Sequence, residues 1–498
     1  MMKVMMKAVC RLLLATVIVS SWLPANAEND FERACSTLTG ESLPQVNLTL
    51  DESRMTKETY IDGHIDIADP LARTTGEVLC SFDCRLHWRG ATSLHYDKKS
   101  IAVKVVDEDG EELNVNMLGI RKKENWILDA MAIDGARMRN RVLFDLWNEM
   151  SGTPWQTDYG QRNGTLGHFV EVYFNGDYHG LYCLTDKIDR KLLGLKKAKE
   201  NGDEVTVRGL QYKCVSHSKA CYLSDYDATA SVDATTWNGY ELKVPEDYPS
   251  LATWQPLMDI IDTCKLRASR LGECYEEFFY RENLVDYMVF VLAFRITDNS
   301  LKNTYLSTPD ITQNKRFIIT PWDLDASLGN SWQGVWQGEM TSMKFLSVVQ
   351  LYNKLYNYNP DFRQAFKARW CELRHTIFSC QNLKLKMSKY ADMLKASGAW
   401  ERERAKWNNN PVPMLEDLHG EVDRVCGWYD LNMEYMNELL KTPWGDVNSD
   451  EVVSGADVTA LYSVLLDGAT PAGDADVNGD GFVNGADVTA LYNLLLEQ

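Results

Sequence analysis

The residues best suited to chemistry lie between positions 298 and 325. Asp298 and Asn303 are five residues apart, and on a helix that spacing would separate them by roughly 140° of arc, so they converge only on a loop. A short apolar strand then leads into Asp323 and Asp325, which would point to the same side of an extended segment. Carboxylates gathered in this way repel one another unless a cation lies between them. The cluster predicts a divalent-metal site; the alternative is a surface turn with a helix-capping Asp.

Phosphoryl transfer in protein kinases uses the same kinds of residue in the same order. A loop Asp accepts the proton of the acceptor hydroxyl, while an Asn further along the loop and an Asp after a following strand hold Mg²⁺ on the phosphates. The N-terminal half offers cations for the phosphate charge. Lys104 lies in a predicted strand of alternating apolar residues, like the strand lysine that contacts the ATP phosphates in kinases. Arg89 precedes a small-residue loop that runs to Ser93. Taken alone, Lys104 could equally be a solvent-facing lysine.

Other chemistries have weaker support. The chain has 8 His and contains no HExxH, CxxC, GxSxG or Walker A motif, which argues against zinc enzymes, serine hydrolases and ordinary NTPases. A glycosidase would need two carboxylates roughly 5–9 Å apart across a cleft. Trp332 and Trp336 beside the acidic cluster could stack on sugars or belong to the core. A carbohydrate-active protein and a non-catalytic scaffold or adhesion component are therefore the alternatives to a phosphotransferase.

The C-terminal tail carries a second set of oxygen ligands. Gly455–Tyr462 returns unchanged as Gly485–Tyr492, 30 residues later, and each copy follows an acidic loop. Each loop places oxygen-bearing side chains at positions 1, 3, 5, 9 and 12 of a calcium loop. These side chains are Asp446, Asn448, Asp450, Ser454 and Asp457, then Asp476, Asn478, Asp480, Asn484 and Asp487. We predict two Ca²⁺ sites, because a solvated acidic linker would not explain the duplication.

The strands and helices decide whether these groups can meet. Alternating apolar residues predict strands at 45–50, 61–67, 79–88 and 100–106. Asn175-Gly176-Asp177 predicts a hairpin turn between strands at 169–174 and 178–185. We further predict helices at 136–150, 284–296 and 415–440 and a short buried strand at 317–320. Strands first and helices later favour an α+β fold over a doubly wound sheet.

Composition and the N-terminus limit the class of protein and its location. The 498 residues are 45% hydrophobic and 25% charged, as in ordinary globular proteins, and the net charge of −19 argues against nucleic acid as a partner. Basic residues, an apolar run at 12–19 and Ala25-Asn26-Ala27 predict a signal peptide over 1–27. No later stretch reads as a membrane anchor. We expect an exported protein, in the extracellular space or the periplasm or held at the cell surface.

Export would place the cysteines in an oxidising compartment, where local disulfides form. The close pairs are Cys80/Cys84, Cys214/Cys221, Cys264/Cys274 and Cys371/Cys380. We predict these as candidate disulfides and Cys183 as a free thiol.

In order along the chain, several motifs resemble the CotH family of atypical, spore-coat-type protein kinases. They are Arg89-Gly90 through Ser93, the segment 137–141, the hairpin from Glu171 to Tyr182, Asp298 through Asn303, and Trp322-Asp323-Leu324-Asp325 through Gly329. The resemblance spans roughly residues 45–440. It implies a reduced kinase-like fold with a β-rich N-terminal part and a helical C-terminal part, which binds ATP with Mg²⁺ or Mn²⁺ and phosphorylates serine or threonine of a protein substrate.

The resemblance also implies roles for particular residues. Asp298 would be the catalytic Asp, and Asn303, Asp323 and Asp325 would bind the metal. Arg89, Ser93 and Lys104 would contact the nucleotide phosphates, with Asp186 near the hinge that meets adenine. Ala91-Thr92 departs from the family pattern in the phosphate-proximal loop.

The tail resembles a type I dockerin, since each loop ends in Asp and is followed by a single helix. This implies docking to a cohesin-type partner. One position departs from the pattern: the turn residue is Gly481 in the second loop and Glu451 in the first. The expected organisation is a signal peptide at 1–27, a kinase-like domain at 28–441 with a β-rich segment at 35–87, and a small all-α dockerin at 446–498.

Overall fold

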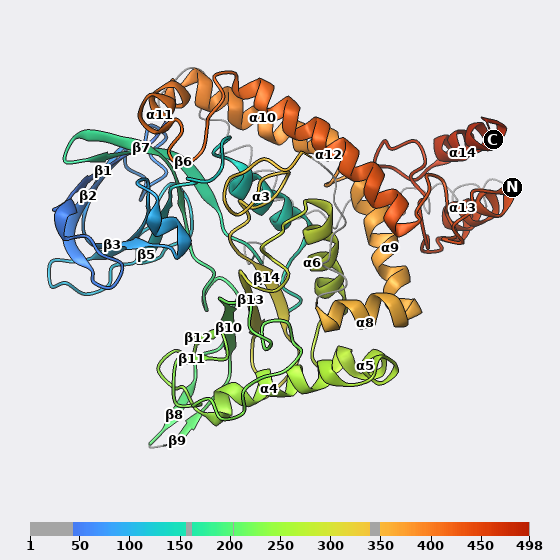
Figure 1. Ribbon diagram of the computed structural model, residues 1–498, viewed down its shortest axis with the longest axis horizontal. Helices are drawn as coiled ribbons and strands as arrows, with labels where there is room; N and C mark the ends of the chain where they lie inside the picture. The colour runs from blue at the N-terminus through green and yellow to red at the C-terminus, as the bar shows by residue number, and fades with distance from the viewer. Residues whose placement is uncertain (1–42, 156–161, 203, 339–348, 498) are drawn as a thin grey trace, which may run out of the picture.

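The computed structural model describes residues 43–155, 162–202, 204–338 and 349–497. The predicted signal peptide and Cys35 lie outside these residues. The chain forms a β-barrel, a second sheet surrounded by helices, and a small helical unit at the C-terminal end (Figure 1).

The first part of the chain closes into a barrel in the strand order β1-β2-β3-β4-β5-β7-β6. The strands are β1 (Gln45–Thr49), β2 (Ile61–Ala68), β3 (Leu79–Arg89), β4 (Ser100–Val106), β5 (Asn125–Asp129), β6 (Gly167–Phe174) and β7 (Asp177–Thr185). Alternate residues such as Val46, Leu48, Val103 and Val105 point inward and are buried. The four N-terminal strands predicted from alternation are therefore confirmed.

A hairpin and a parallel pair complete the barrel. Strands β6 and β7 are joined at Asn175-Gly176, whose φ angles of 51° and 89° are the left-handed values that a tight two-residue hairpin needs. Closure comes from β1, which pairs with β6 in parallel, whereas the other neighbouring strands are antiparallel. The hairpin was predictable from its turn residues, but the parallel closure joins segments that no local pattern connects.

The second part contains a five-stranded sheet in the order β11-β12-β10-β13-β14. Its strands are β10 (Leu210–Cys214), β11 (Thr236–Trp237), β12 (Tyr240–Val244), β13 (Thr304–Thr308) and β14 (Ile318–Pro321), and a short ribbon is formed by β8 (Lys199–Asn201) and β9 (Glu204–Thr206). The α+β prediction is therefore confirmed. The predicted order of strands first and helices later holds only in part, because the strands of this sheet alternate with helices along the chain.

Helices pack around this sheet and extend toward the C-terminus (Figure 1). They are α3 (Arg139–Met150), α4 (Leu251–Lys265), α5 (Ala268–Cys274), α6 (Arg281–Ala293), α8 (Gln350–Tyr358), α9 (Pro360–His375), α10 (Cys380–Ala396), α11 (Ala399–Trp407) and α12 (Leu418–Leu440). The helix predicted from residue 136 begins at Arg139, because Arg137 has a φ of 56° and belongs to the preceding turn.

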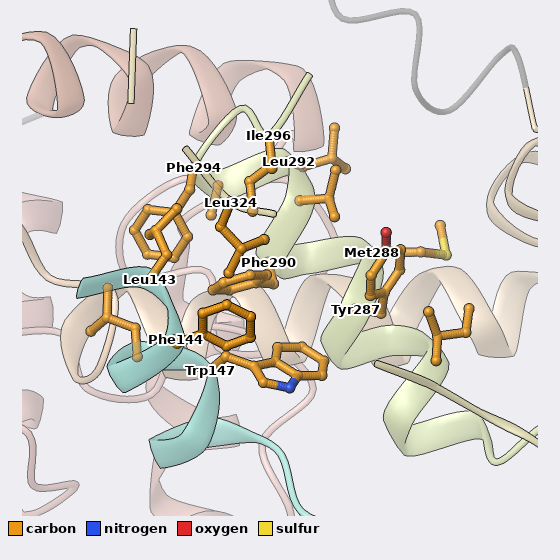
Figure 2. Packing of buried hydrophobic residues seen from close by; sticks show 14 of the residues in the cluster. Leu143, Phe144, Trp147, Tyr287, Met288, Phe290, Leu292, Phe294, Ile296 and Leu324 are labelled. Carbon is orange, nitrogen blue, oxygen red and sulfur yellow. The ribbon is translucent and has the colours of Figure 1, made fainter. Parts of the chain in front are cut away.

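Helix α6 forms the centre of the main core. Every residue from Asn283 to Ala293 is buried, and the run from Tyr287 to Ala293 carries no charged side chain, as expected for a helix that is covered on all sides. Figure 2 shows Phe290 against Trp147 of α3, with a ring-centroid distance of 5.1 Å. Since the loop that follows α6 carries Asp298, this packing fixes the start of that loop.

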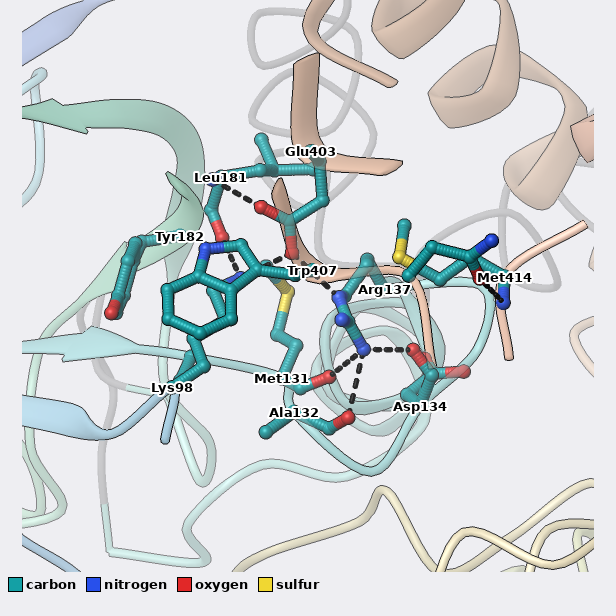
Figure 3. A network of polar contacts seen from close by, with 12 residues as sticks. Lys98, Met131, Ala132, Asp134, Arg137, Leu181, Tyr182, Glu403, Trp407 and Met414 are labelled. Carbon is teal, nitrogen blue, oxygen red and sulfur yellow. Dashed lines mark hydrogen bonds and ion pairs between the residues drawn. The ribbon is translucent and has the colours of Figure 1, made fainter. Parts of the chain in front are cut away.

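A buried ionic network joins the barrel to the helices (Figure 3). Glu403 of α11 accepts hydrogen bonds from Lys98 Nζ at 2.6 Å, Arg137 Nε at 2.8 Å and the Leu181 amide of β7 at 2.7 Å. The side chains of Lys98, Arg137 and Glu403 have no exposed surface. The network therefore clamps strand β7, the turn before α3 and helix α11 together.

In this structure the ten cysteines of the described residues are all in the reduced form, so none of the four predicted disulfides, Cys264/Cys274 included, is present there. Cys80 and Cys84 cannot pair as predicted, since both lie on β3 and four residues of a strand span about 13 Å. Cys380 contacts Cys426 rather than Cys371, whereas Cys214 and Cys221 are in thiol contact. Cys183 is buried and reduced like the other nine, so its assignment as the free thiol of the oxidised protein stays a prediction.

Candidate active site

The loop after α6 brings Asp298 and Asn303 together. The Asn303 amide and the Lys302 ammonium each donate to the Asp298 carboxylate at 2.9 Å. His217, from the segment after β10, places Nε2 3.5 Å from the other carboxylate oxygen. The convergence predicted from the five-residue spacing is confirmed.

Asn299, which the sequence analysis missed, ties this loop to the end of β14. Its buried amide donates to the carbonyl oxygens of Asn303 at 3.2 Å and Trp322 at 2.8 Å, and the Trp322 amide donates in turn to the Asn303 carbonyl. Asn303 has a φ of 56°, a conformation that Asn tolerates better than most residues. Asn299 therefore sets the spacing between Asn303 and the residues after β14.

Asp323 and Asp325 follow β14, but not in an extended segment. The strand ends at Pro321, and Asp323 has a φ of 59°, so the chain turns there and the alternation argument for their shared direction was wrong. Their carboxylates nevertheless face the same group of acids. Burial, followed by the charges of Asp129 and Asp298, raises the pKa of Asp323 to about 6. Burial and then the charge of Asp323 raise the pKa of Asp325 well above its usual range.

Asp129 and Asn140 border this acidic group from the barrel side. Asn140, in the first turn of α3, donates to Asp129 at 2.8 Å and accepts from the Leu324 backbone amide at 3.0 Å. Asn140 therefore holds the backbone between Asp323 and Asp325. The signal for it was present in the 137–141 segment, but Asp129 at the end of β5 carries no sequence signature.

Three cations from different elements lie close to one another here, and two of them, Arg89 and Lys213, act on Asp323. Arg89 at the end of β3 lies over the Trp322 ring at 5.4 Å, and Lys213 of β10 lies over the same ring at 5.8 Å. Lys187 follows β7. Burial and then Arg89 lower the pKa of Lys187 to about 7 and of Lys213 to about 8. Within the described residues these three cations form no ion pair. The charges of Glu241 and Asp323 offset only part of the repulsion and burial that lower the pKa of Lys213.

The other predicted nucleotide residues lie in different surroundings. Lys104 forms an ion pair with Glu112 at 2.6 Å. Asp186 is buried and accepts from Arg121 at 2.7 Å and from the Leu166 amide at 3.0 Å, so its carboxylate is already engaged. Ser93 lies in the short 3-10 helix η2 (Thr92–His95), beside Gly90, where a Cβ would meet its hydroxyl. The structure places Arg89, but none of these three, against the acidic group.

The acidic group fits a divalent cation by the chemistry of its donors. Two carboxylates with raised pKa values, one amide side chain and further acids nearby are the oxygen ligands that Mg²⁺ prefers. Among the residues described, no three His, Cys, Asp or Glu side chains enclose a metal ion by themselves. A bound Mg²⁺ would therefore complete its shell with Asn303, water and phosphate oxygens, as it does in kinases.

The two acidic loops of the tail have matching geometry. Asp446 and Asp476 accept hydrogen bonds from backbone amides within their own loops, and Asp457 and Asp487 close the loops from the first turn of α13 (Gly455–Asp467) and α14 (Gly485–Glu497). Asp457 and Asp487 have no exposed surface. The first and last predicted ligands of each loop are thus both anchored to the backbone of that loop, and Asn, Ser and carbonyl oxygens would supplement their carboxylates as Ca²⁺ ligands.

Together these features define a mixed α+β protein with a kinase-type acidic loop, joined to a pair of calcium loops. The family model described as CotH kinase protein matches residues 86–436, and the model of the dockerin type I domain matches residues 444–496. The chain therefore belongs to the CotH kinase family and carries a C-terminal type I dockerin. No curated protein matches it.

These memberships imply the broad function. The CotH domain implies a kinase with ATP and Mg²⁺, and the dockerin implies Ca²⁺ binding and attachment to a cohesin in an extracellular complex of the cellulosome type. In the part of the chain that the structure describes, no helix combines the length and the apolar character needed to cross a membrane.

Proposed function

We propose that this chain is an exported protein kinase that transfers the γ-phosphate of ATP to serine or threonine of a protein, while its dockerin tethers it to a cohesin-type partner. The observation that carries the proposal is the meeting of opposite charges around Trp322. Arg89 and Lys213 act on the carboxylate of Asp323, which is itself affected by Asp298 and acts on Asp325, and Lys187 lies next to Arg89. A nucleoside triphosphate with Mg²⁺ would compensate both sides, its phosphates the cations and its metal the carboxylates.

Each side chain then has a defined task. Asp298, held by Asn303 and Lys302, would accept the proton of the acceptor hydroxyl. Asn303 and Asp323 would hold the metal. Asp323 suits this task better than Asp325, because the cations Lys213 and Arg89 act on Asp323, whereas Asp325 lies among Asp323, Asp129 and Asp134. A metal held by these residues would neutralise charge on the phosphates.

The phosphates would lie against Arg89, Lys187 and Lys213. Ser93, Lys104 and Asp186 stay predictions from the family resemblance. Lys104 would have to leave Glu112 to reach a phosphate, and Asp186 would contribute to an adenine site through its backbone, since Arg121 occupies its carboxylate.

The proposal is tested by Mg²⁺-dependent ATP binding. We expect millimolar Mg-ATP to raise the melting temperature of the full chain, and Asp323→Asn to abolish most of that rise because it removes a metal ligand. Asp62→Asn is the matched control, since Asp62 lies on β2 with a side chain that is 95% exposed. Equal stabilisation of both variants, or none in the wild type, would favour a scaffold that kept the fold without the activity.

A further inference from the structure

The segment between β10 and β12 contains two cysteines in contact. Cys214 is the last residue of β10, Cys221 lies in the following turn, and both are buried. Their thiols are in contact and share Ser216 as a neighbour: Cys214 Sγ lies 3.8 Å from the Ser216 carbonyl oxygen, and the Ser216 hydroxyl lies 3.6 Å from Cys221 Sγ. Gly239 leaves room for the pair, because a Cβ there would meet Cys221 Sγ at 3.1 Å.

The residues between the two cysteines touch both polar groups of the catalytic loop. His217 lies 3.5 Å from Asp298, and its ring stacks on Tyr222, whose hydroxyl is 2.9 Å from His217 Nδ1. The carbonyl oxygen of Cys214 accepts from the backbone amide of Asn303 at 3.1 Å. A single short stretch of chain therefore contacts Asp298 and Asn303 together.

We propose that Cys214 and Cys221 form a disulfide that fixes this segment against the catalytic loop, with His217 as a positioning residue for Asp298. The bond closes a short ring within the segment and reduces the conformations available to His217. The pairing and its mechanical role are independent of the kinase chemistry, but any effect on turnover rests on the proposed function.

The bond forms by thiol–disulfide exchange with an oxidised dithiol protein in the compartment to which the chain is exported. The thiolate of Cys221 attacks that partner's disulfide and displaces one of its sulfurs; the thiolate of Cys214 then attacks the mixed disulfide and releases the other. Two electrons and two protons pass to the partner, which leaves as a dithiol. Hydrogen bonding from Cys214, and then from Ser218 and Ser216, lowers the pKa of Cys221 to about 6 against the opposing effect of burial, which makes Cys221 the attacking group.

Peptide mapping tests the bond directly. Lys213, Lys219 and Lys243 allow trypsin to separate the two cysteines into peptides 214–219 and 220–243. Protein secreted into an oxidising compartment and alkylated without reductant should give these peptides as one joined species, which a reductant splits. Two separately alkylated peptides from the unreduced protein would overturn the proposal.

Hydrogen exchange and kinetics test the positioning role. Cys214→Ser/Cys221→Ser should speed exchange at residues 297–303, and Cys380→Ser/Cys426→Ser is the matched control because that pair joins α10 and α12. If the chain is a kinase, the first variant and His217→Ala should lower kcat about tenfold with KM for ATP unchanged, and His217→Gln should recover part of it. Unchanged exchange with an intact joined peptide would refute the positioning role, and an inactive wild type would refute only the proposed function.

Discussion

At the scale of single residues, the site is organised by charges that lack partners. Arg89, Lys187 and Lys213 come from three different elements and lie near Trp322 or near one another, and within the described residues none of them forms an ion pair. Asp323 and Asp325 lie mainly among other carboxylates, and Lys213 and Arg89 offset only part of that charge at Asp323. Such an arrangement is costly unless a ligand completes it, which is why groups with strongly perturbed pKa values mark functional sites.

Replacing Lys213 tests the phosphate side of this arrangement. We expect Lys213→Met to weaken Mg-ATP binding about 10- to 100-fold, because it removes one charge-assisted contact worth about 1.5–3 kcal/mol. Isothermal titration of Mg-ATP measures the change. Lys104→Met is the comparison variant, and a loss at Lys104 as large as that at Lys213 would restore the role that the strand pattern predicts for Lys104.

At the scale of elements, the sequence predicted those parts of the fold that rest on local patterns. Alternation located β1 to β4, the Asn175-Gly176 turn located the hairpin, and the short apolar run located β14 to within a residue. The same reasoning found Asp298, Asn303, Asp323 and Asp325, because they lie in short stretches whose spacing has chemical meaning. It missed contacts that depend on the fold.

Lys187, Lys213 and Asp129 illustrate what the sequence could not reveal. Each is a charged residue in or next to a strand that has no distinctive sequence motif. Its charged neighbours come from distant parts of the chain, which meet only because the barrel packs beside the second sheet. The predicted direction of the Asp323 side chain was wrong for a different reason. Its left-handed backbone turns the chain, so the alternation of side chains in an extended strand does not apply there.

The clamp between the barrel and α11 gives a prediction at this scale. Glu403→Gln should lower the free energy of unfolding by about 3–5 kcal/mol, because it leaves buried Lys98 and Arg137 without their counter-charge. Urea unfolding followed by circular dichroism measures the loss. A change below 1 kcal/mol would mean that the clamp contributes little.

The same clamp predicts a pH dependence. Burial alone would raise the pKa of Glu403, but Lys98 and then Arg137 lower it below its ordinary range. The stabilising contribution is therefore complete above the ordinary glutamate pKa of about 4.3 and is lost as the pH falls through the lowered folded value. The wild type should lose stability in this acid range more steeply than Glu403→Gln.

At the scale of the whole molecule, the dockerin is docked on α9 rather than loosely attached (Figure 1). Asp474 is buried and pairs with Arg374 at 2.8 Å and His375 at 2.5 Å, and Arg374 stacks on Trp444 at 4.3 Å. Glu451 reaches Lys367 at 2.9 Å. Glu451 thus contacts the kinase domain from a backbone φ of 74°, at the position where the second loop has Gly481 with a φ of 83°.

Asp474→Asn should loosen this docking, because it leaves the buried Arg374 without a counter-charge. Hydrogen exchange should then rise at the C-terminal end of α9 and in residues 444–457, with no change in the barrel. Glu451→Gln should produce a smaller effect, since its carboxylate is 43% exposed and such ion pairs contribute little. Equal exchange in Asp474→Asn and the wild type would show that packing alone holds the dockerin.

The most direct test of the central claim is phosphate transfer from γ-labelled ATP with Mg²⁺ to a serine- and threonine-rich protein such as casein. We predict labelled phosphoserine or phosphothreonine with the wild type, and a loss of at least 100-fold with Asp298→Asn, which should still bind Mg-ATP because Asp298 acts on the acceptor hydroxyl. Undiminished transfer by both Asp298→Asn and Asp323→Asn would contradict the account, since the reaction would then occur elsewhere on the molecule.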